Sequence, residues 1–164
     1  MTKTMMLLFA ALAVGIAGPS VARAQSAKDL VGTWTLVSAV TEKDGKKFET
    51  FGPGARGMLV FDTTGRFSII FIAAGLPKFA SNNRSQGTID ENKAIVGGSI
   101  AQFGTYVVNE ADKSFTFRVE RSTFPNREGK EQLLAFIVSA DDLMFTDPHS
   151  SAGGATTVTW KRAK

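Results

Sequence analysis

The clearest pattern along the chain is a strict alternation of apolar and polar side chains between Ser114 and Glu120. Phe115, Phe117 and Val119 fall on one face of an extended segment, and the polar residues between them fall on the other. This pattern is typical of a strand with one face in a core and the other in solvent.

Similar segments recur after residue 26, and short turns rich in Gly, Asp and Asn separate them. Asp44-Gly45 suits a tight hairpin turn, because glycine adopts positive φ without strain. We expect strands at 31–41 paired with the segment after residue 46, at 56–62 with 66–72, at 102–109 with 114–120, at 132–140 with 142–146, and at 156–162. The predicted fold class is therefore all-β: one antiparallel barrel of about 8–10 strands.

One segment predicts a helix instead. Thr88-Ile-Asp-Glu91 has the spacing of a capping box, and residues 89–96 can continue for two turns before Gly97-Gly98 ends them. Residues 73–87, which precede this short helix, form a loop long enough to serve as a lid over one end of the barrel.

Three of the expected strands are apolar on both faces, namely Met58–Phe61, Phe67–Ile72 and Leu133–Val138. Their outer faces therefore need cover. A homodimer would supply it, and so would the short helix or the N-terminal segment of the same chain. The sequence leaves both alternatives open.

Residues 1–24 have the pattern of a secretory signal peptide. Lys3 precedes an apolar run over 5–17, Gly18-Pro19 interrupts it, and Ala22-Arg-Ala24 offers the small residues that signal peptidase accepts. The run is shorter than the roughly 20 residues of a membrane-spanning helix. We expect cleavage after Ala24, a periplasmic or secreted product, and one barrel domain over residues 25–164.

Composition narrows the function mainly by exclusion. The 164 residues are 43% hydrophobic and 21% charged, as in globular proteins, and include no cysteine, which excludes disulfides, thiolate catalysis and zinc–sulfur sites. Because Lys3 and Arg23 lie in the expected leader, its removal lowers the formal net charge from +4 to +2. Neither a nucleic acid nor, after signal cleavage, a membrane is expected as a partner.

No motif indicates a cofactor, a metal or a hydrolase. Residues 52–57 match G-x-G-x-x-G, but dinucleotide binding needs a helix after that loop, and a strand is expected there. His149 is the sole histidine and lies in a polar connection, and the chain has no G-x-S-x-G elbow for a serine nucleophile. We therefore expect no cofactor, no metal and no catalytic triad.

The aromatic residues indicate a barrel with an internal ligand-binding site. With 13 Phe against one Tyr and two Trp, the aromatic surface carries few polar groups and suits a small, largely apolar ligand inside the barrel. We expect four aromatic side chains around the cavity: Phe67, Phe71, Tyr106 and Phe117. Arg118 or Arg84 would be the partner of an anionic head group.

Two considerations bear on this predicted internal site. Because successive side chains of a strand point to opposite faces, Phe117 and Arg118 cannot both face inward unless a bulge intervenes. The phenylalanines could also fill the barrel completely, and such a protein would act through its surface.

Two motifs at the ends of the expected barrel carry a family resemblance. Gly32-Thr-Trp34 and Trp160-Lys-Arg162 resemble the lipocalin arrangement, in which a tryptophan closes one end of the barrel beneath a C-terminal arginine. More closely, an ordered series of motifs is similar to the bacterial lipocalin-like domain family: 30–38, Phe51-Gly-Pro, Gly57-Met-Leu, Gly65-Arg-Phe-Ser, Gly104-Thr-Tyr and Ser122-Thr-Phe-Pro-Asn.

The resemblance implies a calycin-type barrel closed by Trp34 and Arg162, and it implies small-molecule binding. The chain departs from similar sequences in two places. Where they often carry an aromatic residue after Pro-Asn and an arginine soon after the following Gln, it has Arg127 and Leu133-Leu134.

A barrel enzyme, such as an isomerase or cyclase acting on an enclosed substrate, is the alternative function. Tyr106 could donate a proton and Glu120 could accept one, since burial raises the pKa of a carboxyl group toward the useful range. This hypothesis requires both side chains to face one cavity.

Overall fold

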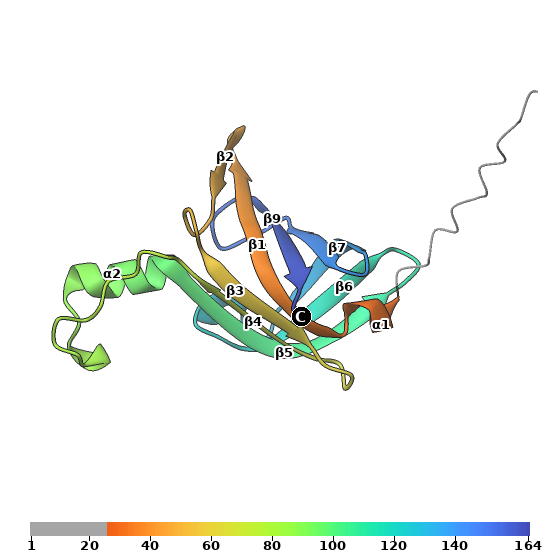
Figure 1. The fold of residues 1–164 in the computed structure, drawn as a ribbon, viewed down its shortest axis with the longest axis horizontal. Coiled ribbons are helices and arrows are strands. Elements are labelled where there is room, and N and C mark those ends of the chain that lie inside the picture. Colours follow the sequence, from red (N-terminus) through yellow and green to blue (C-terminus); the bar gives the residue numbers. More distant parts are fainter. Residues whose placement is uncertain (1–25) are drawn as a thin grey trace, which may run out of the picture.

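In the computed structural model, which describes residues 26–164, one antiparallel sheet closes on itself (Figure 1). The expected signal peptide, residues 1–24, lies outside the described residues. The elements are α1 (Ala27–Leu30), β1 (Gly32–Lys43), β2 (Lys46–Glu49), β3 (Arg56–Phe61), β4 (Arg66–Ile72), η1 (Arg84–Gln86), α2 (Ile89–Gly98), β5 (Ser99–Asn109), β6 (Ser114–Ser122), η2 (Pro125–Arg127), β7 (Glu131–Val138), β8 (Asp142–Asp147) and β9 (Ala155–Arg162). No helix of this part of the chain is long and apolar enough to cross a membrane.

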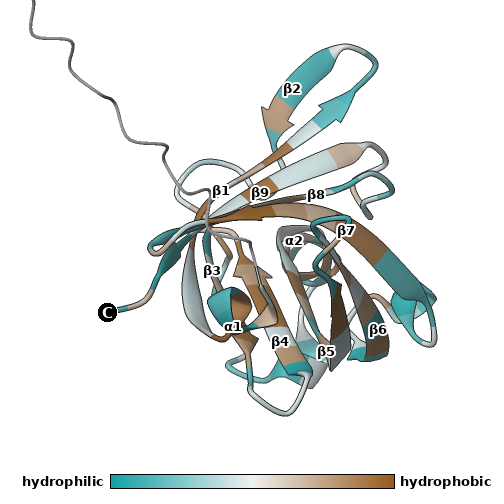
Figure 2. Ribbon diagram, turned by 90° about the vertical axis from the view of Figure 1, so that its right-hand side faces the viewer, coloured by the Kyte–Doolittle hydropathy of each residue, from teal (hydrophilic) through white to brown (hydrophobic). Residues whose placement is uncertain are grey.

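Strand β1 closes the barrel because it pairs along both edges. Its first residues, Gly32–Thr35, pair with β3, and nearly its whole length pairs with β9 on the other edge, with a bulge between Leu36 and Ser38. Its last residues, 40–43, pair with β2 instead. Eight strands therefore form the barrel, and β2 extends past the rim as a polar ribbon (Figure 2). The all-β prediction is confirmed.

The predicted position of the short helix is also confirmed. Thr88 and Glu91 form both hydrogen bonds of the capping box, and α2 begins at Ile89, as expected, but continues to Gly98. The arm formed by η1 and α2 extends away from the barrel at the end opposite α1, so it does not lie over the barrel as a lid (Figure 1).

Strand alternation holds even in the segments that are apolar on both faces. Leu134, Phe136 and Val138 point into the core, whereas Leu133 and Ile137 are 65% and 58% exposed on the outside. The expectation that the helix covers these outer faces is wrong, because α2 has no buried residue and contacts mainly the start of β5. The homodimer stays a hypothesis.

One end of the barrel is sealed by Trp34 and Arg162. The Trp34 indole is fully buried, donates a 2.8 Å hydrogen bond to the Leu30 carbonyl, and lies 4.1 Å from the Arg162 guanidinium carbon. That guanidinium donates to the carbonyls of Asp29, Val31 and Ala140 at 2.7–2.9 Å, so it joins α1 and the β7–β8 turn to the base of the barrel.

Gly32 explains why a glycine precedes this tryptophan. Its φ is +131°, and a Cβ atom there would lie 2.9 Å from Arg162 Nη1. A side chain would therefore combine a strained backbone with displacement of the arginine.

We expect Arg162→Ala to lower the free energy of unfolding by about 3 kcal/mol, because it removes the cation over Trp34 and three charged hydrogen bonds to the backbone. Lys161→Ala, the neighbouring control, breaks only an exposed pair with Asp142 and should lower the free energy of unfolding far less. Urea denaturation measures both variants, and equal losses would contradict the role given to Arg162.

Candidate ligand site at the open end of the barrel

The sealed half of the barrel interior is filled by aromatic rings. Phe61, Phe115, Phe117 and Phe145 contact one another at ring-centroid distances of 4.7–6.4 Å, and Phe67 stacks on Phe117 at 3.7 Å. All are buried. Aromatic rings therefore occupy the barrel interior at the end that Trp34 and Arg162 seal.

At the open end, a small cavity of about 60 Å³ lies above this aromatic floor. Its apolar lining includes Ala39, Phe71, Ile100, Phe117 and Leu134, and its polar lining includes Gln102, Arg127, Gln132, Asp147, Ser150 and Thr156. A volume of this size holds only a few water molecules. A larger ligand would therefore have only one end inside.

Two surface hollows open next to this cavity and share lining residues with it. The first, of about 530 Å³, lies between β2, the end of α2 and the segment before η2, and its lining includes Phe48, Val96 and Phe124. The second, of about 760 Å³, lies between η2 with the start of β7 and the 148–153 loop. The cavity is thus continuous with a wider, partly apolar entrance.

An ion pair lies in the cavity wall. Arg127, at the end of η2, donates to Asp147 Oδ2 at 2.8 Å, and the two side chains are only 16% and 12% exposed. The same oxygen accepts from Gln132 Nε2 at 3.3 Å, and Asp147 Oδ1 accepts from the His149 backbone N–H at 3.0 Å. Burial of either charge without the other would be costly, so the pair stays together.

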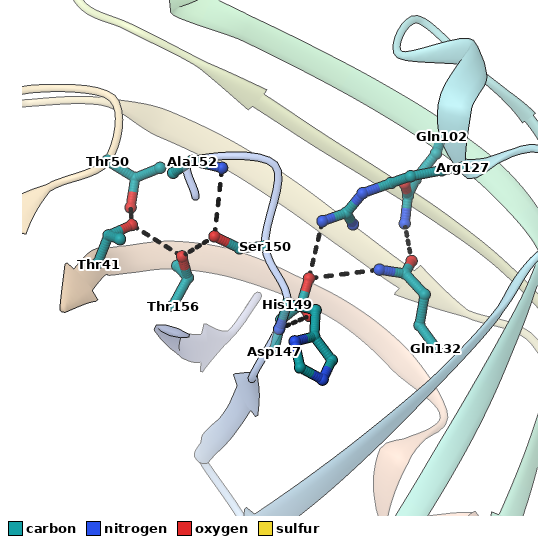
Figure 3. A network of polar contacts seen from close by, with 10 residues as sticks. All are labelled: Thr41, Thr50, Gln102, Arg127, Gln132, Asp147, His149, Ser150, Ala152 and Thr156. Carbon is teal, nitrogen blue, oxygen red and sulfur yellow. Dashed lines mark hydrogen bonds and ion pairs between the residues drawn. The ribbon is translucent and has the colours of Figure 1, made fainter. Parts of the chain in front are cut away.

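The ion pair continues into a chain of amides, drawn in Figure 3. Gln102, on β5 and only 6% exposed, donates through Nε2 to Gln132 Oε1 at 3.0 Å. A second group of contacts joins hydroxyls: Thr41 bonds to Thr50 and to Thr156, and Thr156 donates to Ser150 Oγ at 2.6 Å. Both groups of polar contacts therefore lie at the open end of the barrel.

A family model described as a lipocalin-like domain matches residues 31–163. The chain belongs to the lipocalin-like domain family. The match confirms the resemblance inferred from the Gly-x-Trp motif and the motifs that follow it, and the closed eight-strand barrel agrees with it. No curated protein matches the chain.

The lipocalin-like barrel brings only two of the six expected ligand residues to the cavity, Phe71 and Phe117. Phe67 lies behind Phe117 in the filled core. Tyr106 lies toward the sealed end, where its hydroxyl donates to the Asp62 carbonyl at 2.8 Å and its ring packs edge-on against Phe61.

Neither expected arginine faces the cavity. Arg118 points outward, as the parity of its strand requires once Phe117 points inward, and pairs with Glu131 on the surface. Arg84 is exposed in η1, on the arm beside the barrel. The cation in the cavity wall is Arg127, which sequence reasoning considered only as a departure from similar sequences.

The enzyme hypothesis based on Tyr106 and Glu120 is wrong. Glu120 is the extra residue of a bulge in β6, opposite Phe103 and Gly104, and its carboxylate binds the Arg66 guanidinium on the outer face at 2.8 Å. Tyr106 lies inside. The two side chains therefore cannot act on one substrate. In residues 26–164, no three His, Cys, Asp or Glu side chains form a group that could hold a metal.

The polar lining carried a signal that sequence reasoning missed. Gln102 occupies the same face of β5 as Tyr106, and Asp147 the same face of β8 as Phe145. Polar residues that continue an inward-facing alternation at the end of a strand indicate a polar cavity mouth.

Tyr106 offers a spectroscopic test of its position, because it is the only tyrosine in the chain. Burial, and to a lesser extent the nearby Asp62 carboxylate, raises the pKa of the Tyr106 hydroxyl above its usual value. Absorbance titration near 295 nm should therefore show ionisation at higher pH in the folded protein than in urea. The contribution of Tyr106 to the free energy of unfolding should be constant below the pKa of its hydroxyl in the unfolded chain. It should fall as the pH rises from there toward the pKa in the folded protein. Identical midpoints would place Tyr106 in solvent.

Proposed function

We propose that this lipocalin-like protein is an exported binding protein that holds a small, largely apolar molecule at the open end of its barrel and performs no chemistry on it. The observation that carries the proposal is the cavity on the aromatic floor, which opens into the hollow between β2, α2 and the segment before η2. A concave site with mostly apolar walls and a few placed polar groups is typical of ligand binding.

The entrance supports this proposal because it exposes apolar side chains that the barrel itself does not need. Phe48, Val96 and Phe124 are all substantially exposed and line the first hollow. They come from three separate elements, β2, α2 and the segment before η2. Apolar side chains that converge on one opening from separate elements favour an apolar ligand body there.

Native mass spectrometry of protein purified from its own host tests ligand binding directly. We expect a mass adduct from one small organic molecule. Ala39→Leu should abolish the adduct, because it adds three carbon atoms to the cavity lining. Val40→Leu, the neighbouring control, changes a side chain that does not line the cavity and should keep the adduct. A wild-type protein without any adduct, or an adduct retained in Ala39→Leu, would contradict the proposed site.

Export is a separate part of the proposal and rests on the leader pattern of residues 1–24. N-terminal sequencing of the protein from cell fractions should give a soluble product in the periplasm or medium that begins at Gln25 or within a few residues of it. A product that retains Met1 in the membrane fraction would show that the leader is an anchor.

A further inference from the structure

The carboxylate of Asp147 fixes the direction of the amide chain at the cavity. Three donors converge on it, from Arg127, Gln132 and the His149 backbone, so it acts only as an acceptor. A glutamine amide can be turned end for end, but Gln132 must present its NH₂ group to this acceptor. Its carbonyl oxygen consequently faces Gln102.

The same constraint passes to Gln102. Because Gln132 Oε1 is an acceptor, Gln102 must donate to it through Nε2, at 3.0 Å. Gln102 Oε1 therefore has no hydrogen-bond partner: the atom is buried, and no donor within residues 26–164 binds it. A buried acceptor without a partner destabilises the protein until a donor reaches it. Turning the Gln102 amide would satisfy nothing, since two carbonyl oxygens would then face each other.

The charges in the wall do not favour an anionic ligand. Arg127 is the cation of the cavity, but Asp147 neutralises it at 2.8 Å. A carboxylate entering beside Gln102 would bring a second anion close to Asp147 and a second acceptor to an atom that needs a donor. A neutral donor satisfies Gln102 without either conflict.

We propose that the ligand carries a neutral hydrogen-bond donor at its inner end, an alcohol hydroxyl being the simplest. Gln102 Oε1 accepts the hydrogen bond from this donor. The apolar body of the ligand lies in the hollow lined by Phe48, Val96 and Phe124. This inference rests on the proposed function and specifies the ligand class of that same site. The site selects alcohols over ethers and carboxylates of the same length.

Isothermal titration calorimetry with three probes tests the selection on the unmodified protein. The probes are 1-octanol, its isomer heptyl methyl ether, which accepts but cannot donate, and octanoate. We expect 1-octanol to bind about 10-fold more tightly than the ether, as one hydrogen bond to an otherwise unpaired buried group implies, and octanoate to bind more weakly than 1-octanol.

Two variants assign this preference to Gln102. Gln102→Met removes the accepting oxygen, and it is combined with Gln132→Met because Gln132 Oε1 would otherwise lose its donor and become a new unpaired acceptor. In this double variant the two isomers should bind within about 2-fold of each other. Leu134→Met introduces the same side chain elsewhere in the lining and should keep the preference of the wild type. Circular dichroism checks that both variants fold, and the wild-type comparison decides the question if one does not.

The failures are distinguishable. If both isomers bind equally and Ala39→Leu abolishes the binding of both, the site holds a ligand but Gln102 does not select it. This result contradicts the inference and leaves the proposed function in place. If octanoate binds most tightly, Arg127 recognises an anion, and the inference is again overturned. If none of the three probes binds, the result contradicts both the proposed function and the inference.

Discussion

Strand β1 pairs with both β3 and β9, and this double pairing closes the sheet into a barrel. Closure removes the sheet edges and forces every second side chain into an enclosed space. Toward Trp34 that space is filled with stacked rings and sealed by Arg162. Toward the other end β1 leaves β3 to pair with β2, and the interior opens there. The open end therefore lies where β1 exchanges β3 for β2 as its partner.

Polar groups inside a barrel must find partners, and this requirement shapes the open end. Asp147 would be an uncompensated buried charge without Arg127, which reaches it from η2 across the mouth. Gln132 and Gln102 extend the pair inward as a chain with a defined direction. The network therefore stabilises the connection between η2 and β8 and also determines which hydrogen-bonding groups the cavity offers.

Much of the fold could be predicted from the sequence because it depends on local pattern. Alternation identified Phe115, Phe117 and Val119 as inward-facing, and the capping box located the start of α2 at Ile89. The site could be predicted only in part. Arg127 reaches the cavity from an irregular connection, and Glu120 lies in a bulge, so neither position follows from the period of a strand. Whether Phe67 lines a cavity or fills a core depends on packing across the whole barrel.

Under the proposed function, an apolar ligand enters the open end and reaches the amide chain above the aromatic floor. Mapping amide and methyl chemical-shift changes by NMR, as 1-octanol is added to the labelled protein, tests it most directly. We expect shifts at Ile100, at Leu134 and in the side-chain amide of Gln102, with Trp34 at the sealed end unchanged. Shifts confined to Leu133, Ile137 and Met144 on the outer face would contradict it.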